Sequence, residues 1–172
     1  VLFAASILIK NDFANFAILY SLLQLIMVFI FSGIQEILIG NYLNHLKLNT
    51  ANKFLGNSTV LLFYQFLFIS IIVHLYFYYF LNDHVYYIVI ILLFAGLINS
   101  VLKINSIIHQ LEKNHNTSIK LLNSSIILPN FLGVFFLYLF ETPNSFFLGF
   151  FIGSIINLIF QTKELKFINI MT

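Results

Sequence analysis

The sequence predicts an all-α fold: a polytopic transmembrane helix bundle with about five full spans after a truncated first helix. Three observations predict it. The 172 residues are 60% hydrophobic and 8% charged, with a mean hydropathy of +0.98, whereas soluble domains carry about 25% charged residues. Apolar runs close to the roughly 20 residues that cross a bilayer alternate with short polar breaks. The lysines also gather in alternate breaks.

The apolar runs are apolar on all sides, whereas the strands of a membrane barrel alternate apolar and polar residues, so we expect helices. Four runs are comfortably long enough to span, and the last is short enough to require flanking residues or local bilayer thinning. Residues 1–9 are expected to be the remainder of a helix, and 1–172 to form a single lobe of a larger protein. The predicted full spans are 13–39, 59–81, 86–108, 119–140 and 145–160.

The polar breaks predict how the helices are joined. Residues 10–12 and 82–84 are long enough only for tight reversals. The break at 141–144 contains a proline, which ends one helix and suits the first turn of the next. The Asn-rich break 40–57 is long enough for an amphipathic or extended stretch, and 109–118 for a helix end that projects from the membrane.

Lysine placement predicts the orientation. The breaks at 40–57 and 109–118, the helix ends beside the second of these, and the tail after 160 carry seven of the eight lysines. The remaining breaks carry only Lys10, together with Asp12, Asp83 and Glu141. Because cytoplasmic loops concentrate Lys and Arg, we expect both long breaks and the tail to be cytoplasmic.

Several function classes are disfavoured. The chain has no cysteine, which excludes disulfides, cysteine metal sites and thiol chemistry within it. Its histidines are scattered, and it shows no zinc-protease, nucleophile-elbow or phosphate-loop motif. No basic patch is dense enough to neutralise several phosphates. We therefore expect no enzyme activity, no catalytic residue, no metal, no cofactor and no nucleic-acid partner.

Polar residues inside a membrane helix are costly and often functional. On the third full span, a polar stripe follows helical spacing along the half that leads to 109–118. One interpretation is that the stripe lines a cavity open to the cytoplasm. The other is that the helix extends past the bilayer, with Lys103 reaching the interface. The stripe consists of Gly96, Asn99, Lys103, Ser106 and Gln110.

Other helices supply further candidates for a substrate cavity. Gln24 lies near the middle of the first full span and must meet another helix or a cavity. Glu36 could be a proton or cation site, or a solvated carboxylate near the interface. Asn123 and Asn130 lie on the fourth full span. The candidate cavity residues are Gln24, Glu36, Asn99, Lys103, Asn123 and Asn130.

Two further features concern helix geometry. Pro129 removes a backbone hydrogen bond within the fourth full span and predicts a kink, either static or acting as a hinge. Gly149 and Gly153 form a GxxxG pattern, which predicts a packing seam where another helix approaches closely.

The segment ILIKNDFANFAILYSLLQLIMVFIFSGIQEILIG, residues 7–40, resembles the start of the polysaccharide (O-antigen) flippases of the multidrug/oligosaccharidyl-lipid/polysaccharide exporter superfamily. Members commonly show a turn of the type LG-x-x-x-(F/Y)-G-x-(F/Y)-A-L, here occupied by residues 12–18, and a later Gly followed by an apolar residue, here Gly33-Ile34. Ala14 and Asn15 stand where glycine is usual, and Asn11 replaces an acidic or small residue.

The resemblance implies the first lobe of a two-lobe exporter in the bacterial inner membrane, with the C-terminal lobe missing from this chain. It implies that undecaprenyl-linked oligosaccharide, a precursor of O-antigen and lipopolysaccharide, is flipped by alternating access, with Lys103 available for its pyrophosphate. Three other functions remain open. They are a multidrug exporter of the same superfamily coupled to H⁺ or Na⁺ through Glu36, a membrane enzyme of surface-glycan assembly, and a membrane scaffold.

Overall fold

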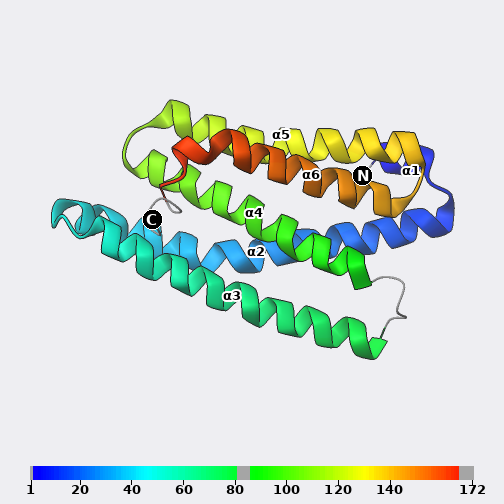
Figure 1. The fold of residues 1–172 in the computed structure, drawn as a ribbon, viewed down its shortest axis with the longest axis horizontal. Coiled ribbons are helices and arrows are strands. Elements are labelled where there is room, and N and C mark those ends of the chain that lie inside the picture. Colours follow the sequence, from blue (N-terminus) through cyan, green and yellow to red (C-terminus); the bar gives the residue numbers. More distant parts are fainter. Residues whose placement is uncertain (1, 81–85, 167–172) are drawn as a thin grey trace.

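The computed structural model describes residues 2–80 and 86–166, and these residues are almost entirely helical. The short α1 precedes five long α-helices, and a 3₁₀ turn, η2, follows the last of them (Figure 1). The elements are α1 (Leu2–Ile7), α2 (Lys10–Lys47), α3 (Ala51–Phe80), α4 (Tyr86–Leu111), α5 (His115–Phe140), α6 (Pro143–Gln161) and η2 (Thr162–Glu164).

The predicted all-α bundle is confirmed. Within the described residues, five helices, α2 to α6, are long and apolar enough to cross a membrane. They lie side by side along the long axis of the molecule (Figure 1). The chain is therefore a multi-pass membrane protein by length and composition of its helices.

Several helices extend beyond the predicted spans. The break expected at 40–57 is mostly helical, because α2 continues to Lys47 and α3 begins at Ala51. The reversal expected at residues 10–12 is wrong: those residues form the first turn of α2, and the chain turns just before them, where Ile9 is extended. Hydropathy marks where a helix crosses hydrocarbon, whereas polar residues continue the same helix beyond it. The predicted turn at 82–84 lies outside the described residues.

The proline-containing break at 141–144 behaves as predicted. Helix α5 ends at Phe140, and Glu141 adopts a left-handed conformation with φ 52°. Pro143 then opens α6, where its missing N–H needs no helical partner. The result is a tight α5–α6 hairpin.

Helix α4 lies at the centre of the bundle. It packs against α2 on one side and against the α5–α6 hairpin on the other, whereas α3 lies mainly along α2 (Figure 1). One end of the bundle carries the α2–α3 turn, the α4–α5 turn and η2, together with the exposed Lys47, Lys53, Lys113 and Lys163. We call this the lysine-rich end.

Candidate functional site

Lys103 lies on α4, facing α2. Its Nζ is 5.8 Å from the centre of the Phe31 ring, within the range of a cation–π contact. The side chain is half-buried. Lys103 is 17 residues after Tyr86, about 26 Å along a helix that rises 1.5 Å per residue. Since the hydrocarbon layer is about 30 Å thick, Lys103 lies toward the lysine-rich end of the span, where the Phe31 ring is its partner.

Asn99, one turn before Lys103, bonds to α6 instead of α2 and is only 1% exposed. Its Nδ2 donates hydrogen bonds to Ser154 Oγ on α6 at 2.7 Å and to Ala95 O at 2.8 Å. Ser154 Oγ in turn donates to Phe150 O at 2.9 Å. Asn99 is therefore an interhelical bridge between α4 and α6.

The rest of the polar stripe on α4 is divided between neighbouring helices. A Cβ added at Gly96 would lie 2.7 Å from Ile26 Cγ2, so this glycine allows α2 to approach closely. Ser106 donates to Ser118 O of α5 at 2.9 Å, and both serines are buried. Gln110 is exposed and Lys103 is half-buried. Within the described bundle the stripe mainly joins helices and does not form one open wall.

The remaining cavity candidates do not come together. Gln24 is half-buried and Glu36 is exposed on α2, while Asn123 is exposed on α5. Asn130 is half-buried, and its Nδ2 donates to Ile126 O of its own helix at 2.7 Å.

The two glycines of the GxxxG pattern lie where α6 meets α5. A Cβ added at Gly153 would lie 2.7 Å from Pro129 Cα, and one added at Gly149 would collide with Leu132 O. Pro129 is buried and α5 continues through it as a helix. The backbone of α6 thus lies directly against Pro129. This contact supports α5 at the position where the sequence predicts a kink or hinge.

A buried polar seam extends from Asn99 toward the lysine-rich end, between α4, α5 and α6. Asn157 is 1% exposed and Gln161 5% exposed, and both lie on α6, a helix made mostly of apolar residues. Gln161 Nε2 is 3.5 Å from Ser124 Oγ. Four buried atoms of the seam have no hydrogen-bond partner among the described residues: Asn99 Oδ1, His109 Nδ1, Asn157 Nδ2 and Gln161 Oε1.

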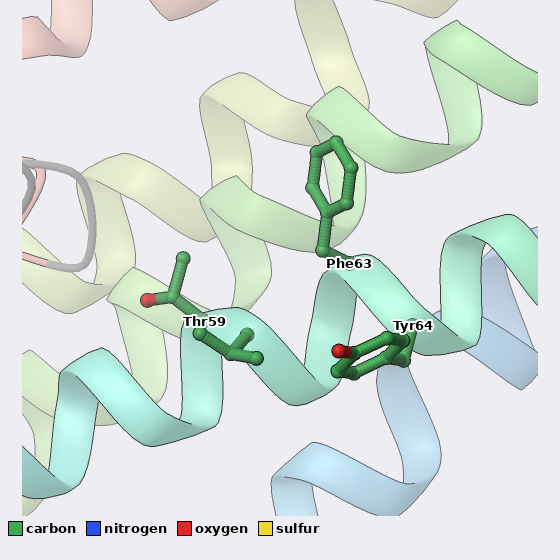
Figure 2. A pocket seen from close by; sticks show the side chains of 4 residues that line it. Thr59, Phe63 and Tyr64 are labelled. Carbon is green, nitrogen blue, oxygen red and sulfur yellow. The ribbon is translucent and has the colours of Figure 1, made fainter.

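Two pockets lie away from these residues. One, of about 380 Å³, lies along α3 and is lined by Thr59, Val60, Phe63 and Tyr64 (Figure 2). A groove of about 280 Å³ between α2 and α3 is likewise lined almost entirely by apolar side chains. Both linings are mainly apolar and suit hydrocarbon, although Thr59 and Tyr64 contribute hydroxyl groups to the first and Gln65 an amide to the second.

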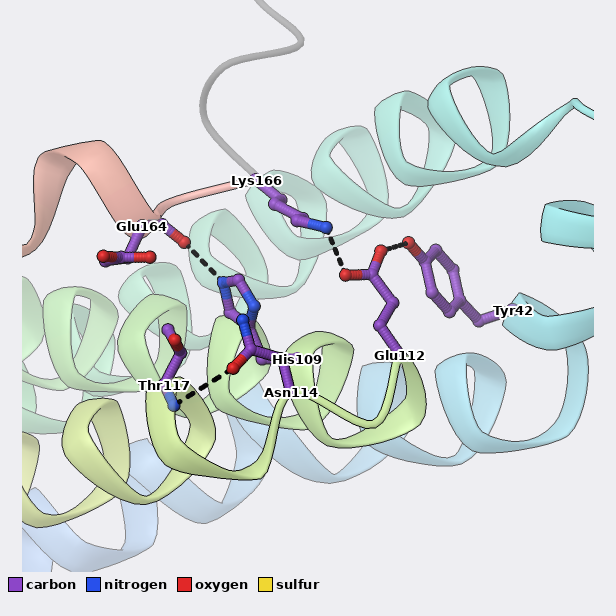
Figure 3. Close-up of polar contacts among 7 residues, drawn as sticks. All are labelled: Tyr42, His109, Glu112, Asn114, Thr117, Glu164 and Lys166. Carbon is purple, nitrogen blue, oxygen red and sulfur yellow. Dashed lines mark hydrogen bonds and ion pairs between the residues drawn. The ribbon is translucent and has the colours of Figure 1, made fainter.

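A polar cluster at the lysine-rich end joins three distant parts of the chain (Figure 3). Tyr42 on α2 donates its hydroxyl proton to Glu112 Oε1 at 2.6 Å, and Lys166 forms a salt bridge with the other carboxylate oxygen. Nearby, His109 Nε2 lies 2.9 Å from Glu164 O. Because a carbonyl oxygen only accepts, Nε2 carries the proton in this contact.

The surroundings of Glu112 act on its acidity in both directions. Burial raises the pKa of this carboxyl, but hydrogen bonds from Lys166 and Tyr42 and the nearby positive charge of Lys166 and His109 lower it by more. The net pKa of Glu112 is below its ordinary value, so the carboxylate is ionised and paired at neutral pH.

Sequence reasoning did not find this cluster. Tyr42, Glu112 and Lys166 lie in three different polar segments, and no local spacing relates residues separated by 70 and 54 positions. Asn157 was visible beside the GxxxG pattern, but its burial depends on how α4 packs against α6.

Comparison of the chain with protein-family models, with curated proteins and with solved structures found no match.

Proposed function

We propose that this chain is one lobe of a transporter that flips lipid-linked oligosaccharide across the bacterial inner membrane by alternating access, with the lysine-rich end in the cytoplasm. The resemblance of residues 7–40 to polysaccharide flippases motivates the proposal. The observation that carries it is Lys103, a half-buried cation on a membrane-spanning helix. Ionisable residues at such positions commonly mark substrate or ion pathways.

Lys103 suits the pyrophosphate of a polyprenyl-linked sugar. Its ammonium group offers three hydrogen-bond donors and no acceptor. The apolar ring of Phe31 shields one side of it without pairing the charge with a carboxylate. A phosphate approaching from the level of the lipid headgroups would meet this cation before entering the span.

The test uses the full-length protein in liposomes that contain a fluorescent lipid-linked oligosaccharide. We expect Lys103→Ala to lower the flipping rate by about tenfold or more, because a hydrogen bond to a charged group contributes roughly 1.5–3 kcal/mol. Lys103→Arg keeps the charge and is expected to retain most of the rate. Lys120→Ala, which removes an exposed lysine of α5, is the matched control.

If Lys103→Ala is present at the normal protein level and flips the substrate at the native rate, Lys103 does not lie on the substrate path. Absence of flipping by the native protein, combined with ion-coupled drug export that Glu36→Gln abolishes, would replace the proposal with a multidrug exporter.

A further inference from the structure

Residues 162–166 fold back across the ends of α4 and α5 at the lysine-rich end, and we call them the strap. Leu165 is 1% exposed and packs with Leu102 of α4 and Leu121 of α5 in a small apolar cluster separate from the main core. One residue earlier, Glu164 O accepts the hydrogen bond from His109 Nε2. The strap is therefore held in place by the apolar contact of Leu165 and the hydrogen bond to Glu164 O.

A third contact holds the end of the strap. Lys166 pairs with Glu112, which also accepts the hydrogen bond from Tyr42 (Figure 3). The side chain of Glu112 is 16% exposed and that of Lys166 is 43% exposed. The ion pair is thus accessible to solvent on the lysine side, while its carboxylate is anchored to α2 by Tyr42.

The strap follows directly from the polar seam. Gln161 immediately precedes it, Asn157 lies one turn earlier, and His109 bonds to the strap itself. Each of these side chains is at least nine-tenths buried and has one polar atom without a partner among the described residues. Buried polar groups nearly always find a partner in protein or water, so these atoms favour hydration.

We propose that the strap is a lid over the α4–α5–α6 seam, and that its release admits water to Asn157, Gln161 and His109. Opening exposes Leu165 and breaks the contacts of Glu164 with His109 and of Lys166 with Glu112. In return it hydrates polar atoms that lack partners while the lid is closed. These opposing effects make the strap a two-position element at the lysine-rich end. The inference does not depend on what the protein transports.

These 172 residues contain no cysteine, so the lid is testable by thiol labelling once any cysteine elsewhere in the full-length protein is replaced by serine. Ser106→Cys places a nearly isosteric probe in the seam, where the native side chain is 4% exposed. Lys113→Cys is an exposed reference near the same end, and Ser145→Cys is a buried reference at the other end, at the start of α6. The full-length protein in nanodiscs is treated with a charged maleimide, and the rate of labelling is measured for each probe.

With the native strap, we expect the Ser106→Cys probe to react at least tenfold more slowly than Lys113→Cys. Glu112→Gln and Lys166→Met, introduced separately, should each accelerate its labelling about fivefold or more. Lys163→Met, which removes an exposed lysine of η2, is the matched control and should leave the rate unchanged. The double exchange Glu112→Lys/Lys166→Glu should restore slow labelling.

Three outcomes would overturn the lid. One is equal labelling of Ser106→Cys with and without the ion pair, and another is labelling as fast as Lys113→Cys in the native protein. The third is a parallel acceleration at Ser145→Cys, which would show general loosening of the bundle. Lys166→Met changes the partly exposed partner of the ion pair, so the test remains decisive if Glu112→Gln fails to fold.

Discussion

The α5–α6 hairpin and helix α3 pack in opposite ways. The hairpin joins two helices through glycines, with backbone lying against backbone at Gly149 and Gly153, and adds buried hydrogen bonds to α4. Helix α3 instead presents large apolar side chains outward, among them Phe63, Phe68 and Ile71, and touches mainly α2. Since lipid is as apolar as these side chains, contact with lipid costs α3 little, whereas the hairpin depends on close fit.

The largest effect is expected where the fit is closest. Gly149→Ala places a Cβ against Leu132 O, a backbone atom that cannot move aside without shifting α5. We expect a loss of about 1–3 kcal/mol, typical of overpacking. Thermal unfolding in detergent measures it. The matched control is Gly40→Ala, at an exposed position of α2 where an added Cβ meets nothing within 4 Å. Equal unfolding temperatures for the two variants would contradict the close α5–α6 seam.

A smaller effect is expected at the contact that links α2 to the hairpin side of the bundle. The pKa of Glu112 is lower in the folded protein than its ordinary value. The carboxylate therefore stabilises the fold above the ordinary pKa, and this contribution is lost as the pH falls through that value toward the lower folded one. Because Lys166 is partly exposed, we expect less than about 1 kcal/mol.

Thermal unfolding of the native protein and of Glu112→Gln between pH 7 and pH 3 measures this contribution. The two proteins should differ most near neutral pH and converge at acidic pH. A difference that stays constant across the range would show that the Glu112 charge does not contribute.

The smallest effect is expected on the outer face of α3. Ile71 is 59% exposed, so Ile71→Ala should change the free energy of unfolding by no more than about 0.5 kcal/mol. The comparison variant is Leu62→Ala on the same helix, where the native side chain is 3% exposed and truncation should cost more than at Ile71, because it leaves a cavity between packed helices. A large loss at Ile71 would show that α3 is held by a partner and not by lipid.

The sequence predicted the helical class and the identity of every long helix, because a run of apolar residues near bilayer length has few other structural solutions. It predicted some helix ends, such as the start of α4 at Tyr86 and the end of α5 at Phe140, but not others. Residues 40–47 are polar enough to look like a loop, yet Tyr42 is buried and continues the helix. Hydropathy reports the solvent around a helix and says little about contacts beyond the hydrocarbon.

The candidate site was predictable only in part. Helical spacing correctly placed Asn99 and Lys103 one turn apart, but it did not show that Asn99 binds Ser154 while Lys103 faces Phe31. Partners on other helices depend on the rotation of each helix about its axis, which a single sequence with weak amphipathicity does not determine.

Helix α2 has a mechanical consequence. At 38 residues it is about 57 Å long, nearly twice the thickness of the hydrocarbon layer. A rigid rod of that length acts as a lever: pivoting it by about 10° around its Lys10 end would displace its Lys47 end by about 10 Å. Small changes of tilt within the bilayer are thus amplified at the far end of α2, where Tyr42 connects the lever to Glu112.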